Sequence, residues 1–526
     1  MTHSIKQKKV SEIAAVLLPY FLLAILMTVV IGLKCNFHVD EIFSYGLANH
    51  PDDMTISIEE GKVYTPAALP FYEYITVQPG FRFYWSNVWE NQAMDVHPPL
   101  YYAILHGICS LFPGQFSRYF AGSINIVFAL IALYYFRRCV RLFTDDRKIL
   151  FLMSLVFAVT PGMLAVGSFL RMYAMAMCWD TIVFYIFLED LGRQKTEPVF
   201  YIKLGLAAAA GALTHYYCIV FTVLLSFLYG LRLLVRKQYK KAAALAATGA
   251  IAGGVSVLIF HPMIRHIFLS YRAAESIDNL KAPFSEFVLR LHKFCGFVNR
   301  EMFGSFGVIM VAFTLIGWIV FYLRNRRSVE PDKTKRTAFL LLYMTCAVYS
   351  LFVSISAVFI SDRYLFPIYP LTLIGFLLPL LQLLKSIGAK TAIPVMIMLV
   401  ITASSYVKYD WYFLYRQSQI LHDSYKSLPQ ADVLCVYKEK WQLYTSFLDI
   451  ENYHNAVYIS ADKMDLIADL YPEDLDQLIL LVTSDAQDVI PLIRKNYPKL
   501  SVMEDKGRLE MITTFYLHAP EKDAGQ

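Results

Sequence analysis

Two adjacent carboxylates, Asp40 and Glu41, follow the first long apolar run of the chain. Charged side chains at the edge of a bilayer need counter-charges, water or a chemical role. The chemical role would be acid–base catalysis, in which a carboxylate takes a proton from a reacting hydroxyl group. Asp40 could instead cap a helix that continues through Tyr45 and Leu47, with Glu41 in its first turn. On these two residues alone, capping is at least as good an interpretation as catalysis.

A second polar motif, DVHPP at residues 95–99, stands where the chain returns to the membrane. Its prolines fix the backbone and start a helix, so Asp95 and His97 are held at a defined point. An ordinary interfacial helix start explains the prolines but not the neighbouring acid and imidazole. The motif therefore favours a chemical role for the carboxylate pair that precedes it.

Cations that could bind a phosphate group lie in later turns. Arg171 lies between two apolar segments, where a charge is expensive and usually functional or paired, although a snorkelling structural arginine is a fair alternative. His215 stands at another such turn, where a satisfied polar residue is commoner than a ligand. Arg363 follows Asp362, and pairing with that acid explains it as well as ligand binding does.

The composition indicates an all-α polytopic membrane protein. The 526 residues are 57% hydrophobic and 17% charged, and apolar runs long enough to cross a bilayer recur from end to end. The net charge of +6 is modest and gives no reason to expect a nucleic-acid partner. The eight cysteines show no CxxC or Cys/His ligand spacing, so neither a zinc site nor a disulfide framework is indicated.

Basic clusters orient the helices. Lysines at positions 6, 8 and 9 place the N-terminus in the cytoplasm, and residues 12–33 cross outward as a retained helix. The loops 137–148, 232–241 and 324–336 are basic, and they fall on the inner side if 99–112 does not cross fully. We expect about 11 transmembrane helices in a catalytic module over residues 1–410. Its external loops are 34–97, with the candidate active site, and 261–301.

The composition changes from about residue 408. Residues 431–437, 456–459 and 477–482 are typical of short strands, and 486–497 of an amphipathic helix. They predict a small soluble α/β domain over residues 411–526, outside the cytoplasm. Without a Gly-rich phosphate loop or a nucleophile elbow, the domain is best interpreted as a cap or an acceptor-docking module.

The ordered motifs resemble those of the GT-C fold membrane glycosyltransferases. Asp-Glu after the first span, Asp-x-His-Pro-Pro-Leu opening the second and Arg-Met-Tyr-Ala in a later outward turn are similar to the protein O-mannosyltransferases and the bacterial aminoarabinose transferases. The resemblance covers roughly residues 1–410. Such enzymes take a sugar from a polyprenyl phosphate on the outer face and invert the anomeric carbon. The mannosyltransferases' extra lumenal domain has no counterpart, because 261–301 is too short for one.

The resemblance implies a role for each candidate residue. Asp40 would be the general base and Glu41 its neighbour in sugar or acceptor binding. The residues expected to bind the donor phosphate or substrate are Asp95, His97, Arg171, Tyr173, His215 and Arg363. The partners would be a polyprenyl-phosphate-linked sugar, membrane lipid and an unknown glycan, lipid or protein acceptor. The expected location is a bacterial plasma membrane.

The chemistry agrees with this hypothesis. A lipid phosphate leaves without a general acid, so one carboxylate base suffices, whereas a glycosidase needs paired acids. Mg²⁺ or Mn²⁺ could bind between Asp40, Glu41 and Asp95, but the spacing requires no cofactor. The alternatives are a transporter or flippase, which internal repeats would favour, and a polymerase or ligase that uses a lipid-linked glycan.

Overall fold

The computed structural model describes residues 2–51, 55–65, 71–193, 197–324, 330–425, 428, 431–445 and 455–520. The chain divides into two compact units. The bundle unit consists of Met1–Gly32, Gln92–Ile104 and Arg118–Asp410. The sheet unit consists of Leu33–Asn91, Leu105–Ser117 and Trp411–Gln526. Arg326 and Arg327, in the third of the basic loops, lie outside the described residues.

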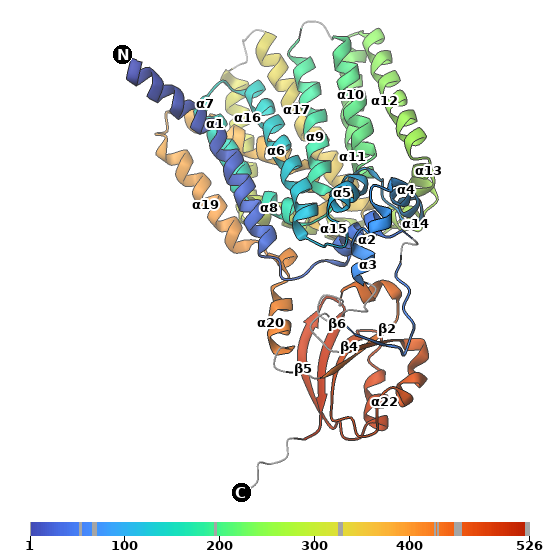
Figure 1. Ribbon diagram of the computed structural model, residues 1–526. Coiled ribbons are helices and arrows are strands. Elements are labelled where there is room, and N and C mark those ends of the chain that lie inside the picture. The colour runs from blue at the N-terminus through green and yellow to red at the C-terminus, as the bar shows by residue number, and fades with distance from the viewer. Residues whose placement is uncertain are drawn as a thin grey trace. The chain divides into compact units, whose positions relative to one another are not determined.

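Lipid tolerates helices because they satisfy their backbone hydrogen bonds internally. The bundle unit is built from helices, both long apolar ones and shorter or amphipathic ones. They are α1 (Thr2–Gly32), α6 (Arg118–Phe143), α7 (Arg147–Val159), α8 (Pro161–Ser168), α9 (Tyr173–Leu191), α10 (Pro198–Ala212), α11 (Tyr216–Val235), α12 (Tyr239–Ile259), α13 (Met263–Phe268), α14 (Tyr271–Leu280), α15 (Phe284–Phe303), α16 (Gly307–Arg324), α17 (Glu330–Ser356), α18 (Tyr369–Ser386) and α19 (Ala392–Lys408), with the 3-10 turns η3 (Asp362–Tyr364) and η4 (Phe366–Ile368) (Figure 1).

Six helices among the described residues are long and apolar enough to cross a membrane. Two bent pairs, α7 with α8 and α15 with α16, raise that number to eight if each pair is one span. Three shorter apolar helices are α10, α19 and α5 (Leu100–Leu111). The 12 residues of α5 span about 18 Å, less than the roughly 30 Å of a bilayer core, so α5 alone is too short to cross. The expected number of spans stays a prediction.

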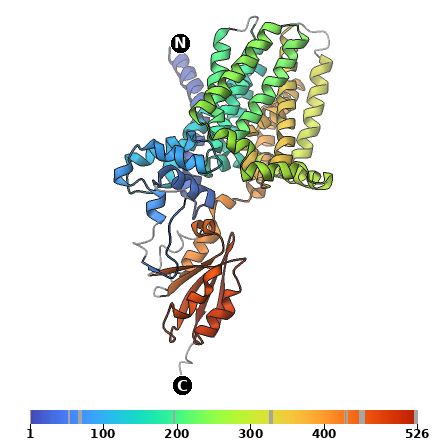
Figure 2. The ribbon, with the colours of Figure 1, turned by 90° about the vertical axis from the view of Figure 1, so that its right-hand side faces the viewer.

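Residues 261–301, expected to form a loop, are largely helical. Ser270 caps α14 by accepting the Ala273 N–H at 3.1 Å. The helices α14 and α15 are amphipathic rather than uniformly apolar, which explains why a search for spans in the sequence left them out. The chain then bends by 81° from α15 into α16. Figure 2 shows this stretch of the bundle unit running across the direction of its long helices.

A six-stranded sheet with the order β1-β3-β2-β4-β6-β5 organises the sheet unit. The predicted strands β2 (Asp432–Tyr437), β3 (Ala456–Ser460) and β4 (Gln477–Thr483) are parallel and central, with Leu434 opposite both Val457 and Leu480. The predicted helix is α22 (Val489–Asn496), which packs with η7 (Ala461–Asp469) on the apolar core of the sheet. Three further strands were not predicted from the sequence, namely β1 (Val63–Tyr64), β5 (Val502–Leu509) and β6 (Ile512–His518).

The segment after the first span contributes to this unit. Its β1 pairs antiparallel with β3, and the Gly61 N–H donates to the Tyr458 carbonyl at 3.1 Å. Its helix α2 (Val39–Asn49) packs against α3 (Phe71–Ile75), where a Cβ added at Gly46 would lie 1.9 Å from the Tyr74 ring. The remaining elements are α4 (Trp85–Met94), α20 (Arg416–Tyr425) and the 3-10 turns η2 (Pro79–Phe81), η5 (Tyr412–Leu414) and η6 (Lys440–Thr445). Close packing therefore fixes the helix that carries Asp40.

Candidate active site

The carboxylate pair lies in the first turn of α2, but His38 caps this helix, not Asp40. The Asp40 N–H donates to His38 Nδ1 at 3.0 Å, and the His38 N–H donates to Glu41 Oε2 at 2.7 Å. This reciprocal capping box satisfies two N–H groups at the start of the helix. Because Nδ1 accepts a hydrogen bond, a neutral His38 carries its proton on Nε2.

Glu41 forms a buried ion pair that sequence reasoning missed. Lys34 Nζ lies 3.0 Å from Glu41 Oε1, and both side chains are 0% exposed. Lys34 also donates to the Phe413 carbonyl at 2.5 Å and lies 5.7 Å from the centre of the Tyr415 ring. Both Glu41 oxygens are thus engaged by groups of the protein. Asp40, whose side chain is 28% exposed, is the more accessible acid of the pair.

A third carboxylate, Glu510, comes to the same place from the turn between β5 and β6. The Tyr415 hydroxyl donates to Glu510 Oε1 at 2.7 Å. His38 Nε2 lies 4.0 Å from that oxygen, and His38 Nδ1 lies 3.8 Å from Asp40 Oδ2. Burial raises the pKa of Tyr415 well above its usual 10.0, as do the negative charges of Glu510, Glu41 and Asp40. Tyr415 therefore remains a hydrogen-bond donor at neutral pH.

In the bundle unit, Asp95, His97 and Arg171 form a hydrogen-bonded chain. His97 Nδ1 lies 2.6 Å from Asp95 Oδ2, and Arg171 Nη2 lies 3.2 Å from His97 Nε2. A guanidinium can only donate, so His97 Nε2 accepts and Nδ1–H donates to the carboxylate. Arg171, which is 2% exposed, is thereby held in a fixed orientation.

Electrostatics keep Asp95 ionised in this chain. Burial by itself would raise the pKa of Asp95, but the His97 imidazole, which donates a hydrogen bond to the carboxylate, and the nearby Arg171 lower the pKa below the usual 3.8. The carboxylate is therefore negative at neutral pH and balances part of the positive charge beside it.

His215, Tyr173 and Arg363 lie near this chain, and their role as ligands stays a prediction. His215 caps α11 by accepting the Tyr217 N–H on Nδ1 at 3.1 Å. Burial lowers the pKa of His215 well below 6.5, and His97, Arg171 and Arg363 act in the same direction. His215 is thus neutral at pH 7, with Nε2 as a donor. The Tyr173 ring lies 5.3 Å from that of His215.

Arg363 packs on aromatic rings. Its guanidinium carbon lies 5.5 Å, 5.7 Å and 5.9 Å from the ring centres of Tyr364, Phe169 and Phe359. The Arg363 backbone N–H donates to Asp362 Oδ1 at 2.8 Å. The neighbouring acid therefore orders the backbone of the turn, and stacking orients the guanidinium plane.

Three residues that were not among the predicted ligands, Asn125, Tyr216 and His266, hold this cluster. Asn125 Nδ2 on α6 donates to the carbonyls of Gly167 and Phe169 at 3.1 Å and 2.8 Å, which fixes the turn before Arg171. The Tyr216 hydroxyl lies 2.8 Å from His266 Nδ1. His266 Nε2 in turn lies 3.2 Å from the Ala93 carbonyl, just before Asp95. An asparagine inside an apolar helix was the available signal for Asn125.

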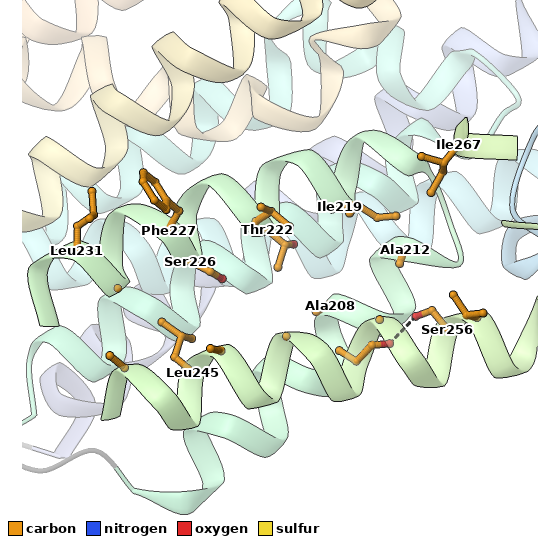
Figure 3. Close-up of a pocket in the computed structure, with 18 of the residues that line it drawn as sticks. Ala208, Ala212, Ile219, Thr222, Ser226, Phe227, Leu231, Leu245, Ser256 and Ile267 are labelled. Carbon is orange, nitrogen blue, oxygen red and sulfur yellow. Dashed lines mark hydrogen bonds between the residues drawn. The ribbon is translucent and has the colours of Figure 1, made fainter. Parts of the chain in front are cut away.

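An apolar cavity of about 580 Å³ lies between α10, α11, α12 and α13. Figure 3 shows Ala212 and Ile267 at one end and Leu231 and Leu245 at the other. Ala212 comes three residues before His215 in the chain, so this end adjoins the turn that carries the histidine. The wall is mostly alanine, glycine and aliphatic side chains, with the Phe227 ring and the hydroxyls of Thr222, Ser226 and Ser256. The Ser256 hydroxyl donates to the Ala252 carbonyl at 2.8 Å.

The suggested metal ligands belong to different units, with Asp40 and Glu41 in the sheet unit and Asp95 in the bundle unit. Among the described residues, no group of three or more His, Cys, Asp or Glu side chains could hold a metal ion. The oxygens of Glu41 are engaged by Lys34 and by the His38 N–H. The suggested Mg²⁺ or Mn²⁺ stays a prediction and enters no step proposed below.

The candidate residues thus form two groups. Asp40 and Glu41 belong to the sheet unit. The six others, all in the bundle unit, are Asp95, His97, Arg171, Tyr173, His215 and Arg363. The first group offers an accessible carboxylate and the second a fixed set of cations and neutral donors.

No protein-family model matches the chain, and no curated protein matches it in sequence. Among solved structures, the chain is similar to ArnT from Cupriavidus metallidurans bound to undecaprenyl phosphate, with 12% identity, a TM-score of 0.53 and coverage of 95% of this chain and 97% of that chain. The apo state of the same ArnT is 12% identical, with a TM-score of 0.53 and coverage of 98% of each chain. The archaeal oligosaccharyltransferase AglB from Archaeoglobus fulgidus, in complex with an inhibitory peptide and a dolichol-phosphate, is 9% identical, with a TM-score of 0.41 and coverage of 88% of this chain and 69% of that chain. The likeness to ArnT over almost the whole of both chains shows that this protein has the GT-C fold that its sequence motifs predicted.

Proposed function

We propose that the protein is an integral-membrane, inverting glycosyltransferase that moves a sugar from a polyprenyl-phosphate donor to an acceptor outside the cytoplasm. The observation that carries the proposal is the chain from Asp95 through His97 to Arg171, with Arg363 close by. A buried, oriented guanidinium suits a phosphate, whose oxygens it can bind two at a time.

The apolar cavity supports a lipid-linked donor. Its end at Ala212 adjoins the turn of His215, and its walls carry almost no polar groups. In the proposal the phosphate binds near Arg171, and part of the prenyl chain lies between α10, α11 and α12. ArnT, which shares the fold, was crystallised with undecaprenyl phosphate.

Asp40 is the proposed general base. It takes the proton of the acceptor hydroxyl as that oxygen forms a bond to the anomeric carbon. The bond between this carbon and the phosphate oxygen breaks, and the electron pair leaves with the phosphate. Attack opposite the leaving group inverts the anomeric centre. Arg171 and Arg363 stabilise the charge that gathers on the phosphate in the transition state.

Two buried arginines of the bundle unit provide a matched test of phosphate binding. Arg171 is 2% and Arg137 is 7% exposed, and Arg137 donates to the Ser154 hydroxyl at 2.7 Å. Binding of undecaprenyl phosphate would be measured for purified protein in nanodiscs. We expect Arg171→Ala to weaken binding about tenfold to a hundredfold, because charge-assisted hydrogen bonds are lost. Arg171→Lys should keep part of the affinity, and Arg137→Ala should bind as the wild type does.

The activity itself is tested in cells that lack the protein. Mass spectrometry of their lipid extract should show a polyprenyl-phosphate sugar that accumulates relative to wild-type cells, which also identifies the sugar. Complementation with wild-type protein should restore its level, and Arg171→Ala should not. An unchanged lipid pool, together with equal undecaprenyl phosphate binding by Arg171→Ala and Arg137→Ala, would contradict the proposal.

A further inference from the structure

Glu510 and Tyr415 share an unusual backbone conformation. Glu510 has a φ of 51° and Tyr415 a φ of 52°, so both lie in the left-handed region. A side chain with a Cβ disfavours this region, and glycine or asparagine usually occupies it. The Tyr415 hydroxyl and the Glu510 carboxylate are joined by a hydrogen bond of 2.7 Å. Two disfavoured conformations thus meet at one contact.

The turn between β5 and β6 does not need a glutamate. Glu510 and Met511 form a two-residue turn between the paired residues Leu509 and Ile512. Such turns are made most easily by Asn-Gly, Asp-Gly or Gly-Gly, because positive φ is then tolerated. Strain of this kind persists where the surrounding structure holds it, and it gathers at functional sites. The side chain of Glu510 is therefore the feature to explain.

That side chain reaches the group that holds Asp40. Glu510 Oε1 lies 4.0 Å from His38 Nε2, the nitrogen that carries the proton when Nδ1 accepts the Asp40 N–H. The imidazole lies between two carboxylates, with Asp40 Oδ2 at 3.8 Å from Nδ1. A negative charge near Nε2–H favours the tautomer of His38 that is protonated on Nε2. In this tautomer Nδ1 has a lone pair that accepts the hydrogen bond from the Asp40 N–H.

We propose that Glu510 is a positioning residue for Asp40, and that it acts through His38 to hold the first turn of α2 in the orientation needed for proton transfer. The inference rests on the proposed function of Asp40. In this inference the C-terminal strands contribute to the chemistry, whereas the sequence favoured a cap or docking module without a chemical role. Tyr415 orients Glu510 and so belongs to the same chain of contacts.

The test measures consumption of a synthetic undecaprenyl-phosphate sugar by full-length protein in nanodiscs, with total envelope lipid as the source of acceptor. We expect Glu510→Gln and Glu510→Gly to lower kcat about tenfold, as small misplacements of a catalytic group do, with KM for the donor unchanged. Glu510→Gly should melt at the same temperature as the wild type or higher, because glycine relieves the positive φ.

Two further variants separate positioning from general stability. Glu504→Gln is the control, because Glu504 lies on the same hairpin but pairs with Lys506 and His518. It should leave kcat unchanged. Tyr415→Phe should lower kcat in wild type but not further in Glu510→Gln, because both changes act through one carboxylate.

Glu510→Gln and Glu510→Gly with wild-type kcat would overturn the inference, as would a tenfold loss in Glu504→Gln. Asp40→Asn in the same assay keeps the two proposals apart. If Asp40→Asn is inactive and the Glu510 variants are fully active, only the positioning role fails. If wild-type protein consumes no donor, or Asp40→Asn consumes it at the wild-type rate, the proposed function fails and the positioning role falls with it.

Discussion

Removal of one partner from the Lys34–Glu41 pair should destabilise α2 strongly. The ions lie 3.0 Å apart and are 0% exposed, so water does not solvate a charge left alone. Coulomb's law at an effective dielectric constant of about 20 gives an attraction of about 5 kcal/mol at this distance. Loss of one partner of a buried pair typically costs about 3–5 kcal/mol.

Glu41→Gln tests this value, both alone and in combination with Lys34→Met. It leaves the Lys34 ammonium buried, with the Phe413 carbonyl and the rings of Phe37 and Tyr415 among its remaining contacts. Because these contacts remain, we expect the free energy of unfolding of α2 to fall by an amount at the lower end of that range, about 3 kcal/mol. That energy corresponds to a loss of more than about a hundredfold in hydrogen-exchange protection for amides in α2. The double variant Lys34→Met/Glu41→Gln should regain most of the protection, because no lone charge remains.

The assay is hydrogen exchange followed by mass spectrometry of the peptide that covers α2, with protein in nanodiscs. Asp40→Asn is the control, because its side chain is 28% exposed and outside the ion pair. If Glu41→Gln exchanges as slowly as wild type but consumes no donor, then Glu41 takes part in the chemistry and the structural reasoning is wrong. If the double variant is no better than Glu41→Gln, the ion pair is not the source of the stability.

Three further predictions concern Asp40, Asp95 and the orientation of the chain in the membrane. Asp40→Asn should lower donor consumption at least about a hundredfold with an unchanged melting temperature, because a general base is removed; a loss of only a few-fold would exclude Asp40 as the base. The lowered pKa of Asp95 means that the folded state favours its ionised form, so its contribution to stability is full above about pH 4 and is lost as pH falls through the folded-state value. Melting temperatures of wild type and Asp95→Asn should therefore differ by a constant amount above about pH 5, and the difference should shrink as pH falls below about 4, whereas a difference that does not shrink on acidification would exclude this linkage. In spheroplasts, a cysteine in place of Asp505 should react with an impermeant maleimide, and one in place of Lys237 should react only after permeabilisation; the reverse would overturn the proposed orientation.

Local patterns in the sequence were enough to find the elements with a uniform environment. Helices such as α11 and α12 are apolar throughout because lipid or other helices surround them, and β2, β3 and β4 are apolar because both faces of the central strands are buried. The same logic missed β5, whose sequence VMEDKGRL belongs to an edge strand with solvent on one side. It also missed β1, whose two residues form a strand only through their pairing with β3.

The sequence by itself determined the class of the protein, the turns between apolar helices and the residue types at them, because charge at the end of an apolar run is a local signal. Only the tertiary structure decided what each charge does. Lys34 neutralises Glu41, and His97 joins Asp95 to Arg171. Glu510 comes within 4.0 Å of His38 although hundreds of residues separate them in the chain. A contact of this kind depends on the path of the whole backbone, which no local pattern of side chains encodes.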